Sequence, residues 1–137
     1  MLKKKVLLAD DDTVFLRIIT QYLDDAEFSY IVTQDGEQAW HCLQQYQDGF
    51  FLILADRIMP KLDGLGLLAK IQQTPQLCDV PLILLTGEAS KEERCEAIAQ
   101  GVYDFFYKPI SKKLLLAVLK KAEKQQILGN GHLYKNG

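Results

Sequence analysis

Carboxylate side chains follow two of the most apolar stretches of this sequence, at the point where each stretch ends. Asp10 and Asp11 follow a run that begins after Lys4, and Asp56 ends the run that begins at Phe50. Three carboxylates about 4 Å apart would repel one another by roughly 4 kcal/mol per pair at an effective dielectric constant near 20. A lysine and a hard divalent cation such as Mg²⁺, which prefers oxygen ligands, would offset this repulsion. The three aspartates are therefore candidate metal ligands.

Two other apolar runs are followed or ended by polar residues that could form one site with these aspartates, Thr86 and Lys108. A carboxylate can act as a nucleophile and form an aspartyl phosphate, and Asp56 is the candidate for that role. The transition state of phosphoryl transfer spreads negative charge over the phosphoryl oxygens, so catalysis needs positioned cations and hydrogen-bond donors. Mg²⁺ held by Asp10 and Asp11 would supply part of that positive charge. The Lys108 ammonium and the Thr86 hydroxyl would each pair with a further oxygen.

The elements that position these residues follow from the spacing of the apolar side chains. Apolar runs of strand length alternate with stretches in which apolar residues recur every three or four positions, as on one buried face of a helix. This alternation predicts an α/β fold with a doubly wound, flavodoxin-like (βα)5 arrangement, because parallel strands need helical crossovers that cover both faces of the sheet. Strands are expected at residues 4–9, 29–34, 50–56, 80–86 and 103–107, and helices at residues 13–23, 37–47, 65–71, 90–101 and 111–122.

The strand order follows from how apolar each strand is. The first, third and fourth strands are the most apolar and should be central, which fits a parallel sheet of order 2-1-3-4-5. In such open sheets, ligands bind outside the carboxyl ends of the strands, where the order reverses. The fold therefore gathers residues that are far apart in the sequence at one edge of the sheet, namely Asp10, Asp11, Asp56, Thr86 and Lys108.

Short polar residues mark where three of the helices begin. Asp12, Ser90 and Ser111 each precede a helical pattern, and their side-chain oxygens can accept hydrogen bonds from the free N–H groups of the first turn. The apolar spacing then predicts which side of each helix faces the sheet. The side chains expected on these buried faces include Val14, Ile18 and Leu114.

Length and composition limit the remaining possibilities. The chain has 137 residues, of which 48% are hydrophobic, enough for one domain with one sizeable core. Its formal net charge of −2 argues against a nucleic-acid surface, and it has no apolar stretch long enough to span a membrane. We expect a cytoplasmic protein with a domain at residues 1–123. Residues 124–137 are polar and are expected to form a frayed tail or the start of a linker.

Five motifs in this order resemble the receiver domain of the response regulators of two-component signalling, of the kind found in chemotaxis. The resemblance covers residues 3 to about 122. Each motif alone would be weak evidence, whereas all of them at these intervals are highly specific. The motifs are Asp10-Asp11, Asp56-Arg57-Ile58-Met59-Pro60, Asp63-Gly64, Leu84-Leu85-Thr86-Gly87 and Lys108-Pro109.

This resemblance implies a function and further site residues. Asp56 would take a phosphoryl group from a sensor histidine kinase or a histidine phosphotransfer protein in a Mg²⁺-dependent reaction. The backbone carbonyl of Ile58 would join the aspartates around Mg²⁺, and the Lys108–Pro109 peptide bond would be cis. Such a domain is not an enzyme in the ordinary sense, because it catalyses only its own phosphorylation and dephosphorylation.

The resemblance also implies how the signal leaves the domain. Thr86 would move toward the phosphoryl group, and the ring of Phe105 would turn inward into the space that it vacates. We favour this switch over a role for Phe105 as a plain core residue. The face formed by the fourth helix, the fifth strand and the fifth helix would then act on a downstream protein or a fused output domain, or form a homodimer.

Two positions, Arg57 and Gly87, depart from the family pattern. Arg57 directly follows the acceptor, where an apolar residue is more usual. It would either meet the incoming phosphodonor or lie in solvent. We favour the solvated arrangement, because exposed loop arginines usually contribute little.

Three other functions fit parts of the sequence. A flavin-binding module would share the fold, but the turn at Asp10, Asp11 and Asp12 would repel a phosphate. A free-standing phosphatase would need a second carboxylate just after the nucleophile, where Ile58 stands. A degenerate receiver, used as a docking module independently of phosphorylation, is the third alternative and would keep these residues without the chemistry.

Overall fold

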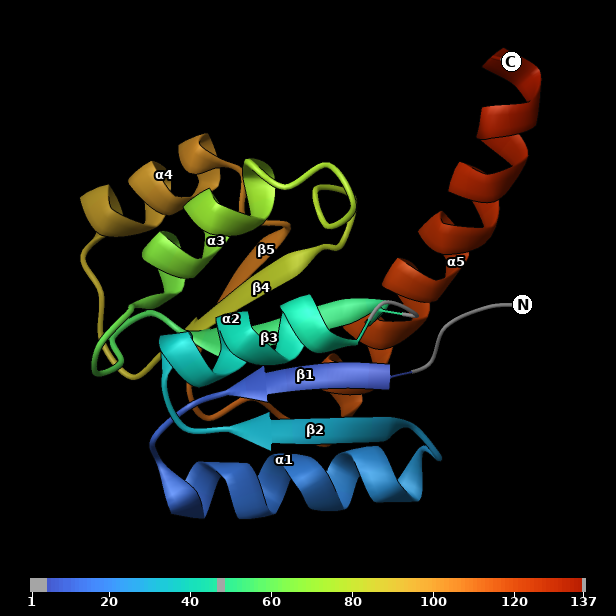
Figure 1. Cartoon of the computed structure of the whole chain (residues 1–137). Helices are drawn as coiled ribbons and strands as arrows, with labels where there is room; N and C mark the ends of the chain where they lie inside the picture. Colours follow the sequence, from blue (N-terminus) through green and yellow to red (C-terminus); the bar gives the residue numbers. More distant parts are fainter. Residues whose placement is uncertain (1–4, 47–48, 137) are drawn as a thin grey trace.

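The computed structural model describes the backbone of residues 5–46 and 49–136 and the side chains through Gln126. Its centre is one parallel sheet in the order β2-β1-β3-β4-β5, which confirms the predicted fold and strand order (Figure 1). The strands are β1 (Lys5–Ala9), β2 (Ser29–Thr33), β3 (Leu52–Asp56), β4 (Leu82–Thr86) and β5 (Asp104–Tyr107).

Helices cover both faces of this sheet. Side chains from α1 and α5 pack with one set of alternate strand residues, and side chains from α2, α3 and α4 pack with the other set. Figure 1 shows the same division, with α1 on one side of the sheet and α2, α3 and α4 on the other. The helices are α1 (Thr13–Asp25), α2 (Gly36–Gln45), α3 (Gly64–Gln72), α4 (Lys91–Gln100) and α5 (Lys112–Asn136).

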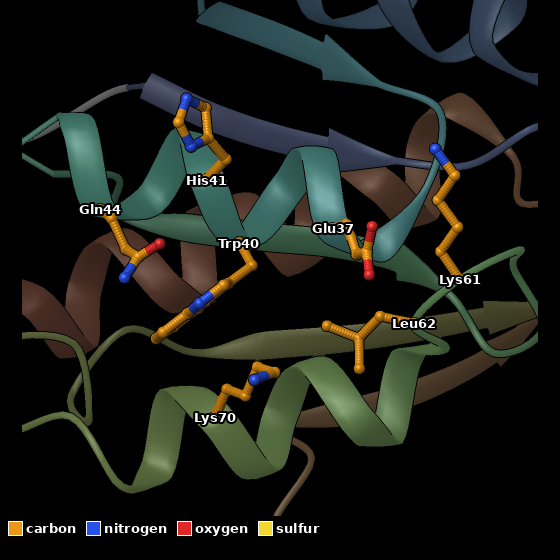
Figure 2. Close-up of a pocket in the computed structure, with 7 residues that line it drawn as sticks. All are labelled: Glu37, Trp40, His41, Gln44, Lys61, Leu62 and Lys70. Atoms are coloured by element: carbon orange, nitrogen blue, oxygen red, sulfur yellow. The ribbon is translucent and has the colours of Figure 1, made fainter.

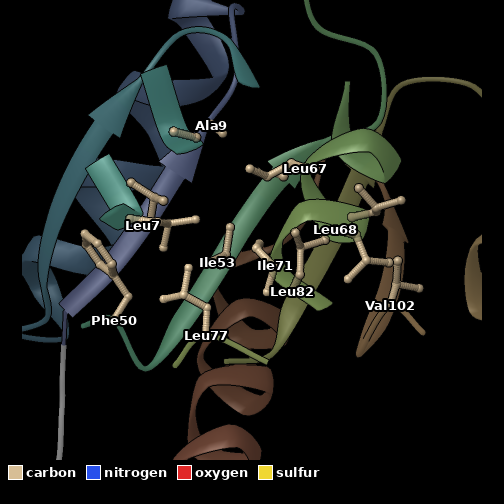
Figure 3. Close-up of a cluster of buried hydrophobic side chains, with 14 of the residues drawn as sticks. Leu7, Ala9, Phe50, Ile53, Leu67, Leu68, Ile71, Leu77, Leu82 and Val102 are labelled. Atoms are coloured by element: carbon tan, nitrogen blue, oxygen red, sulfur yellow. The ribbon is translucent and has the colours of Figure 1, made fainter. Parts of the chain in front are cut away.

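The core lies against the three central strands. Almost every residue of β1, β3 and β4 is buried, because helices shield both faces of these strands. Successive side chains of a strand point to opposite faces, so Leu7 and Ile53 lie in the cluster under α2 and α3, whereas Leu8 and Leu54 lie in the cluster under α1 and α5. Figure 3 shows the first of these clusters, in which Leu67 and other residues of α3 meet the sheet.

Side-chain caps fix the starts of three helices, as predicted. The Asp12 carboxylate accepts hydrogen bonds from the N–H groups of Val14 and Phe15. Ser90 and the side chain of the residue three positions later form a reciprocal capping box at the start of α4. The Ser111 hydroxyl accepts from the N–H group three residues further on, at the start of α5. These caps satisfy N–H groups that have no partner within their own helix.

The predicted buried faces of α1 and α5 were too wide. Val14 is 65% exposed and Ile18 is 43% exposed, so the prediction that both are buried is wrong. The buried stripe of α1 is instead centred on Phe15 and Ile19. Because Val14 and Ile18 are four residues apart, they form a neighbouring row at the edge of this stripe. Leu114 on α5 is likewise 41% exposed.

Helix α5 is longer than the sequence predicted. It continues to Asn136, so the described backbone is helical where a frayed tail was one of the two expectations, and the start of a linker, the other, stays a prediction. Residues 124–128 contain no helix breaker, and the glycines at 129 and 131 each cost only about 1 kcal/mol in helix propensity. The boundary at residue 123 stays a prediction, and Lys4 and Gln47, expected at element ends, lie outside the described residues. Within residues 5–46 and 49–136, no helix has both the length and the apolar character needed to cross a bilayer.

The loop after β3 packs closely on the start of α2. A Cβ atom added at Gly36 would lie 1.9 Å from the carbonyl oxygen of Leu62, far inside van der Waals contact. Next to this contact, Lys61 Nζ lies 3.9 Å from a carboxylate oxygen of Asp35. The loop that leaves β3 therefore depends on the absence of a side chain at residue 36.

Gly36→Ala is expected to lower the free energy of unfolding by about 2 kcal/mol, because the loop must move away from α2 to make room for the methyl group. Urea denaturation would measure this change. Gly87→Ala is the matched control, since an added Cβ there meets nothing within 4 Å. Equal stabilities of the two variants would contradict the role given to Gly36.

Candidate functional site

Three carboxylates meet at the carboxyl ends of β1 and β3. The two strands are in register, with Ala9 opposite Ala55, so the residues that follow lie side by side. Asp10, Asp11 and Asp56 each offer an oxygen, and these oxygens lie within 4.8 Å of one another. Asp10 is buried, Asp56 is half-buried and Asp11 is exposed. The sequence prediction that these three residues form one cluster is therefore confirmed.

Lys108 brings a positive charge into the same cluster from the end of β5. Its Nζ lies 2.7 Å from Asp10 Oδ2 and 3.5 Å from Asp56 Oδ2. The ammonium also lies 4.4 Å from the centre of the Phe15 ring, on the first turn of α1. The Lys108–Pro109 peptide bond is cis, as expected. Lys108 thus touches both strand ends that carry the carboxylates.

The protein environment disfavours the charged form of Asp56. Burial is the main cause that raises the pKa of Asp56 above its ordinary value, and the charge of Asp10 raises it further. Lys108 and a hydrogen bond from the backbone of Ile58 lower the pKa of Asp56 and offset part of this effect. The Asp10 carboxylate also accepts from the Asp12 N–H at 2.9 Å. Burial and the charge of Asp10 together therefore outweigh Lys108 and Ile58 in their effect on the pKa of Asp56.

Of the predicted switch residues, Thr86 ends β4 and Phe105 lies within β5. Thr86 is buried, and its Oγ1 donates a hydrogen bond to the Glu88 carbonyl at 2.8 Å. Phe105 is only 2% exposed, so its ring already points into the core in this structure. It packs edge to face with Tyr107, which lies on the same side of β5, at 5.6 Å between ring centres. The inward movement of Phe105 stays a prediction.

The prediction that Arg57 lies in solvent is wrong. Its side chain is 17% exposed and forms a 2.8 Å ion pair with Glu93 of α4. A second guanidinium nitrogen donates to the Glu88 carbonyl at 2.9 Å. Sequence reasoning missed this because both partners are more than 30 residues away, and only the folded sheet brings them next to residue 57.

Sequence reasoning also did not identify Tyr107 and Phe15 as residues that contact the site and its loops. The Tyr107 hydroxyl donates to the Ala89 carbonyl at 3.1 Å and so contacts the loop after β4 from the β5 side. The alternation of side chains in strands was the available signal, because it places residues 105 and 107 on one face. Phe15 gave no such signal, since its spacing fits an ordinary core residue.

A separate hollow of about 410 Å³ lies between α2 and α3. Figure 2 shows Trp40 of α2 directed toward α3, where Lys70 Nζ lies 5.6 Å from the indole ring centre. The lining carries one carboxylate, from Glu37, together with basic and neutral side chains, so it offers no cluster of oxygen ligands. It contains none of the predicted site residues. The lining residues are Glu37, Trp40, His41, Gln44, Lys61, Leu62 and Lys70.

The donor set at the sheet edge fits a hard divalent cation. Asp10, Asp11 and Asp56 all contribute carboxylate oxygens, the ligand type that Mg²⁺ prefers, and they leave room in the coordination sphere for water or phosphate oxygens. Lys108 lies next to two of these carboxylates, those of Asp10 and Asp56, and can pair with a further anionic oxygen. The side chain of Ile58 is exposed, and the role of its carbonyl stays a prediction.

Comparisons with known proteins agree with this geometry. The family model for the response regulator receiver domain matches residues 6–120. The probable transcriptional regulator ycf29 of Porphyra purpurea is 30% identical over 95% of this chain and 61% of its own length. The transcriptional regulatory protein CpxR of Escherichia coli strain K12 is 34% identical over 93% of this chain and 55% of its own. The chain thus spans about three fifths of the length of these two relatives.

A solved structure resembles the chain over nearly its whole length. The receiver domain of sensor histidine kinase PA1611 from Pseudomonas aeruginosa PAO1 matches with a TM-score of 0.80 at 25% identity. The match covers 89% of this chain and 98% of that one. That receiver domain has a magnesium ion coordinated in its active site cleft.

Asp56→Asn is expected to raise the free energy of unfolding by about 1 kcal/mol, and Tm by about 4 °C, when divalent cations are chelated. The reason is that the raised pKa makes ionised Asp56 less favourable in the folded state than in the unfolded state. Because protonation removes this penalty, the difference between variant and wild type should shrink as the pH falls through the pKa of Asp56.

Thermal denaturation at several pH values would measure this difference. Asp11→Asn is the matched control, because Asp11 is exposed and its replacement should change stability by less than about 0.5 kcal/mol. A lower stability of Asp56→Asn at neutral pH would contradict the electrostatic account.

Proposed function

The chain belongs to the response regulator receiver domain family, and from that premise we propose that Asp56 is the residue that accepts the phosphoryl group. The observation that carries the proposal is the meeting of Asp10, Asp11 and Asp56 with Lys108 at one edge of the sheet. A carboxylate oxygen of Asp56 would attack phosphorus, and the bond from phosphorus to the donor would break. The electron pair of that bond leaves with the donor group, and an aspartyl phosphate forms.

Asp10, Asp11 and Asp56, with the Ile58 carbonyl, are the groups that would hold Mg²⁺. When bound, Mg²⁺ supplies positive charge that offsets the carboxylates and the phosphoryl oxygens. The magnesium in the related PA1611 receiver domain supports this assignment. Lys108 would orient one phosphoryl oxygen through a charge-assisted hydrogen bond, since its Nζ already lies 3.5 Å from Asp56 Oδ2.

Thr86 would report the phosphorylation to the rest of the domain. Its hydroxyl has one proton, which it donates to the Glu88 carbonyl here, so it must turn to donate to a phosphoryl oxygen. We keep Thr86 and Phe105 as the proposed switch pair. Phosphorylation would act by a population shift toward the arrangement in which Thr86 contacts the phosphoryl group. The ring of Phe105 is buried already in the present arrangement, in which Thr86 donates to Glu88.

The phosphodonor would be a sensor histidine kinase or a histidine phosphotransfer protein. Apolar side chains that are exposed around the site support docking of a protein rather than only a small molecule. Val14 and Ile18 lie on α1 just after the acidic turn, and Ile58 lies two residues after Asp56. A phosphohistidine that approaches Asp56 would bring its own protein surface over these residues.

The output would act through the face made by α4, β5 and α5. The curated relatives are longer transcriptional regulators, so a fused output domain after α5 fits their length, and a separate downstream protein or a homodimer fits the same face. The second candidate function is a docking module that works independently of phosphorylation. It predicts the same fold with no phosphoryl transfer, so one experiment separates the two.

Incubation with acetyl phosphate and Mg²⁺ is expected to add one phosphoryl group to the chain, and intact mass spectrometry would measure the gain. The gain should disappear when Mg²⁺ is chelated and in Asp56→Asn, because the first removes the charge that offsets the carboxylates and the second removes the nucleophile. A wild-type chain that gains no mass and binds no Mg²⁺ in a titration would leave the docking module as the function.

Lys108→Gln is expected to slow the phosphorylation of Asp56 by roughly 100-fold, because it removes a positioned cation from the developing charge of the transition state. The rate of mass gain at fixed acetyl phosphate would measure the effect. Lys112→Gln is the control, since Lys112 pairs with Asp25 outside the site and its replacement should leave the rate unchanged. Equal rates for Lys108→Gln and wild type would rule out the role given to Lys108.

A further inference from the structure

Arg57 connects two loops that border the acidic cluster. It follows Asp56 at the end of β3, and its guanidinium pairs with Glu93 in the first turn of α4 and with the Glu88 carbonyl in the loop after β4. Because the guanidinium is a planar fork, it can hold two acceptors at once in a fixed geometry. The contact therefore fixes the start of α4 relative to the end of the acceptor strand.

The Glu88 carbonyl receives a second hydrogen bond from the residue proposed to sense the phosphoryl group. Thr86 Oγ1 donates to it at 2.8 Å, and an Arg57 nitrogen donates to it at 2.9 Å. The next carbonyl along the loop, that of Ala89, accepts from the Tyr107 hydroxyl. A turn of Thr86 toward Asp56 would thus remove one of two donors from the carbonyl that Arg57 holds.

The charge state of Glu93 and the hydrogen bonding of Arg57 both bear on this contact. Hydrogen bonds from Ser90, and then the charge of Arg57, lower the pKa of Glu93, so its carboxylate is ionised at neutral pH. Among the residues that the structure describes, Arg57 Nε is buried and has no hydrogen-bond partner. A buried donor without a partner raises the free energy of its arrangement. The arrangement described here therefore has this cost at Arg57.

We propose that Arg57 is a positioning residue whose contacts with Glu93 and the Glu88 carbonyl form a latch. The latch holds the loop after β4 and the first turn of α4 in the arrangement in which Thr86 donates to Glu88. This inference rests on the proposed function, because it assumes that Asp56 and Thr86 respond to a phosphoryl group. It deepens that function by giving the phosphorylated strand a direct connection to α4, in addition to the path through Thr86.

The latch should lower the fraction of molecules in the active arrangement, the one that binds the phosphoryl group. Contacts present only in the Thr86-to-Glu88 arrangement lower its free energy relative to the arrangement that binds the phosphoryl group. The apparent affinity for a phosphoryl mimic is reduced in proportion to the fraction of molecules in the competent arrangement. Weakening the latch should therefore tighten binding of the mimic rather than loosen it.

Titration with beryllofluoride in the presence of Mg²⁺ tests this inference on the full chain. Glu93→Gln is the cleanest variant, because the amide oxygen of glutamine can keep the capping box with Ser90. The amide nitrogen then replaces the charged oxygen that accepts from Arg57, so the variant removes both the charge and this acceptor. Glu93→Gln and Arg57→Gln are each expected to bind beryllofluoride about 2- to 5-fold more tightly than wild type, the range of one partly exposed ion pair. The double variant should bind no more tightly than the tighter single variant, because both changes break one latch.

Nuclear magnetic resonance gives a second test, because a purely structural role of Arg57 would not shift amide signals toward their positions in the beryllofluoride-bound state. In the absence of beryllofluoride, the amide signals of Gly87 and Glu88 in both variants should shift toward their positions in the beryllofluoride-bound wild type. The matched control is the Lys112–Asp25 pair, which has the same 2.8 Å separation and lies outside the site. Lys112→Gln and Asp25→Asn should leave both the affinity and these signals unchanged.

The outcomes separate this inference from the function on which it rests. A wild type that binds beryllofluoride, together with latch variants that fold but keep its affinity and its amide positions, overturns the latch alone. Weaker binding by Glu93→Gln overturns it as well, because the ion pair would then favour the active arrangement. A wild type that neither binds beryllofluoride nor gains a phosphoryl group overturns both proposals.

Discussion

The structure depends on how one lysine ammonium balances the carboxylates at the edge of the sheet. Lys108 lies within ion-pair distance of both Asp10 and Asp56, yet burial and the charge of Asp10 still raise the pKa of Asp56. A buried charge that loses its partner is strongly destabilising. The strand ends that carry Lys108 and these carboxylates must therefore keep their relative positions. The rest of the fold can be understood as the framework that keeps these ends in place.

That framework uses close backbone contacts as well as apolar packing. A Cβ atom added at Gly64 would lie 2.6 Å from the Asp56 carbonyl oxygen and 2.4 Å from a methyl carbon of Leu84. The start of α3 therefore lies directly against β3 and its neighbour β4. Together with the contact between Gly36 and Leu62, this leaves the loop after Asp56 little room to move away from the cluster. Small residues here serve the site, although they carry no chemistry.

Periodicity and the residues at strand ends were enough to predict the fold and the acidic cluster. Predictions failed where the environment of a side chain is made by residues far away in the sequence. Apolar runs alternating with helical spacing were enough for the sheet order and for the meeting of Asp10, Asp11, Asp56 and Lys108. Arg57 could not be placed in this way, because its environment is made by α4, which comes more than 30 residues later. The exposed apolar side chains of α1 were missed because periodicity gives the direction of a buried face better than its width.

The length of α5 has a mechanical consequence. The helix starts four residues after Lys108 and runs without interruption for 25 residues, past the edge of the sheet (Figure 1). Its first part is held on the sheet by Leu115, Leu119 and Ala122, which lie in the core. The backbone of residues 124–136 extends beyond this packed part, over about 20 Å at 1.5 Å per residue. A tilt of about 10° at the start of this extension would displace its far end by about 3 Å. The extension is thus a lever arm, which enlarges a small rotation at the end of the packed part without moving the core.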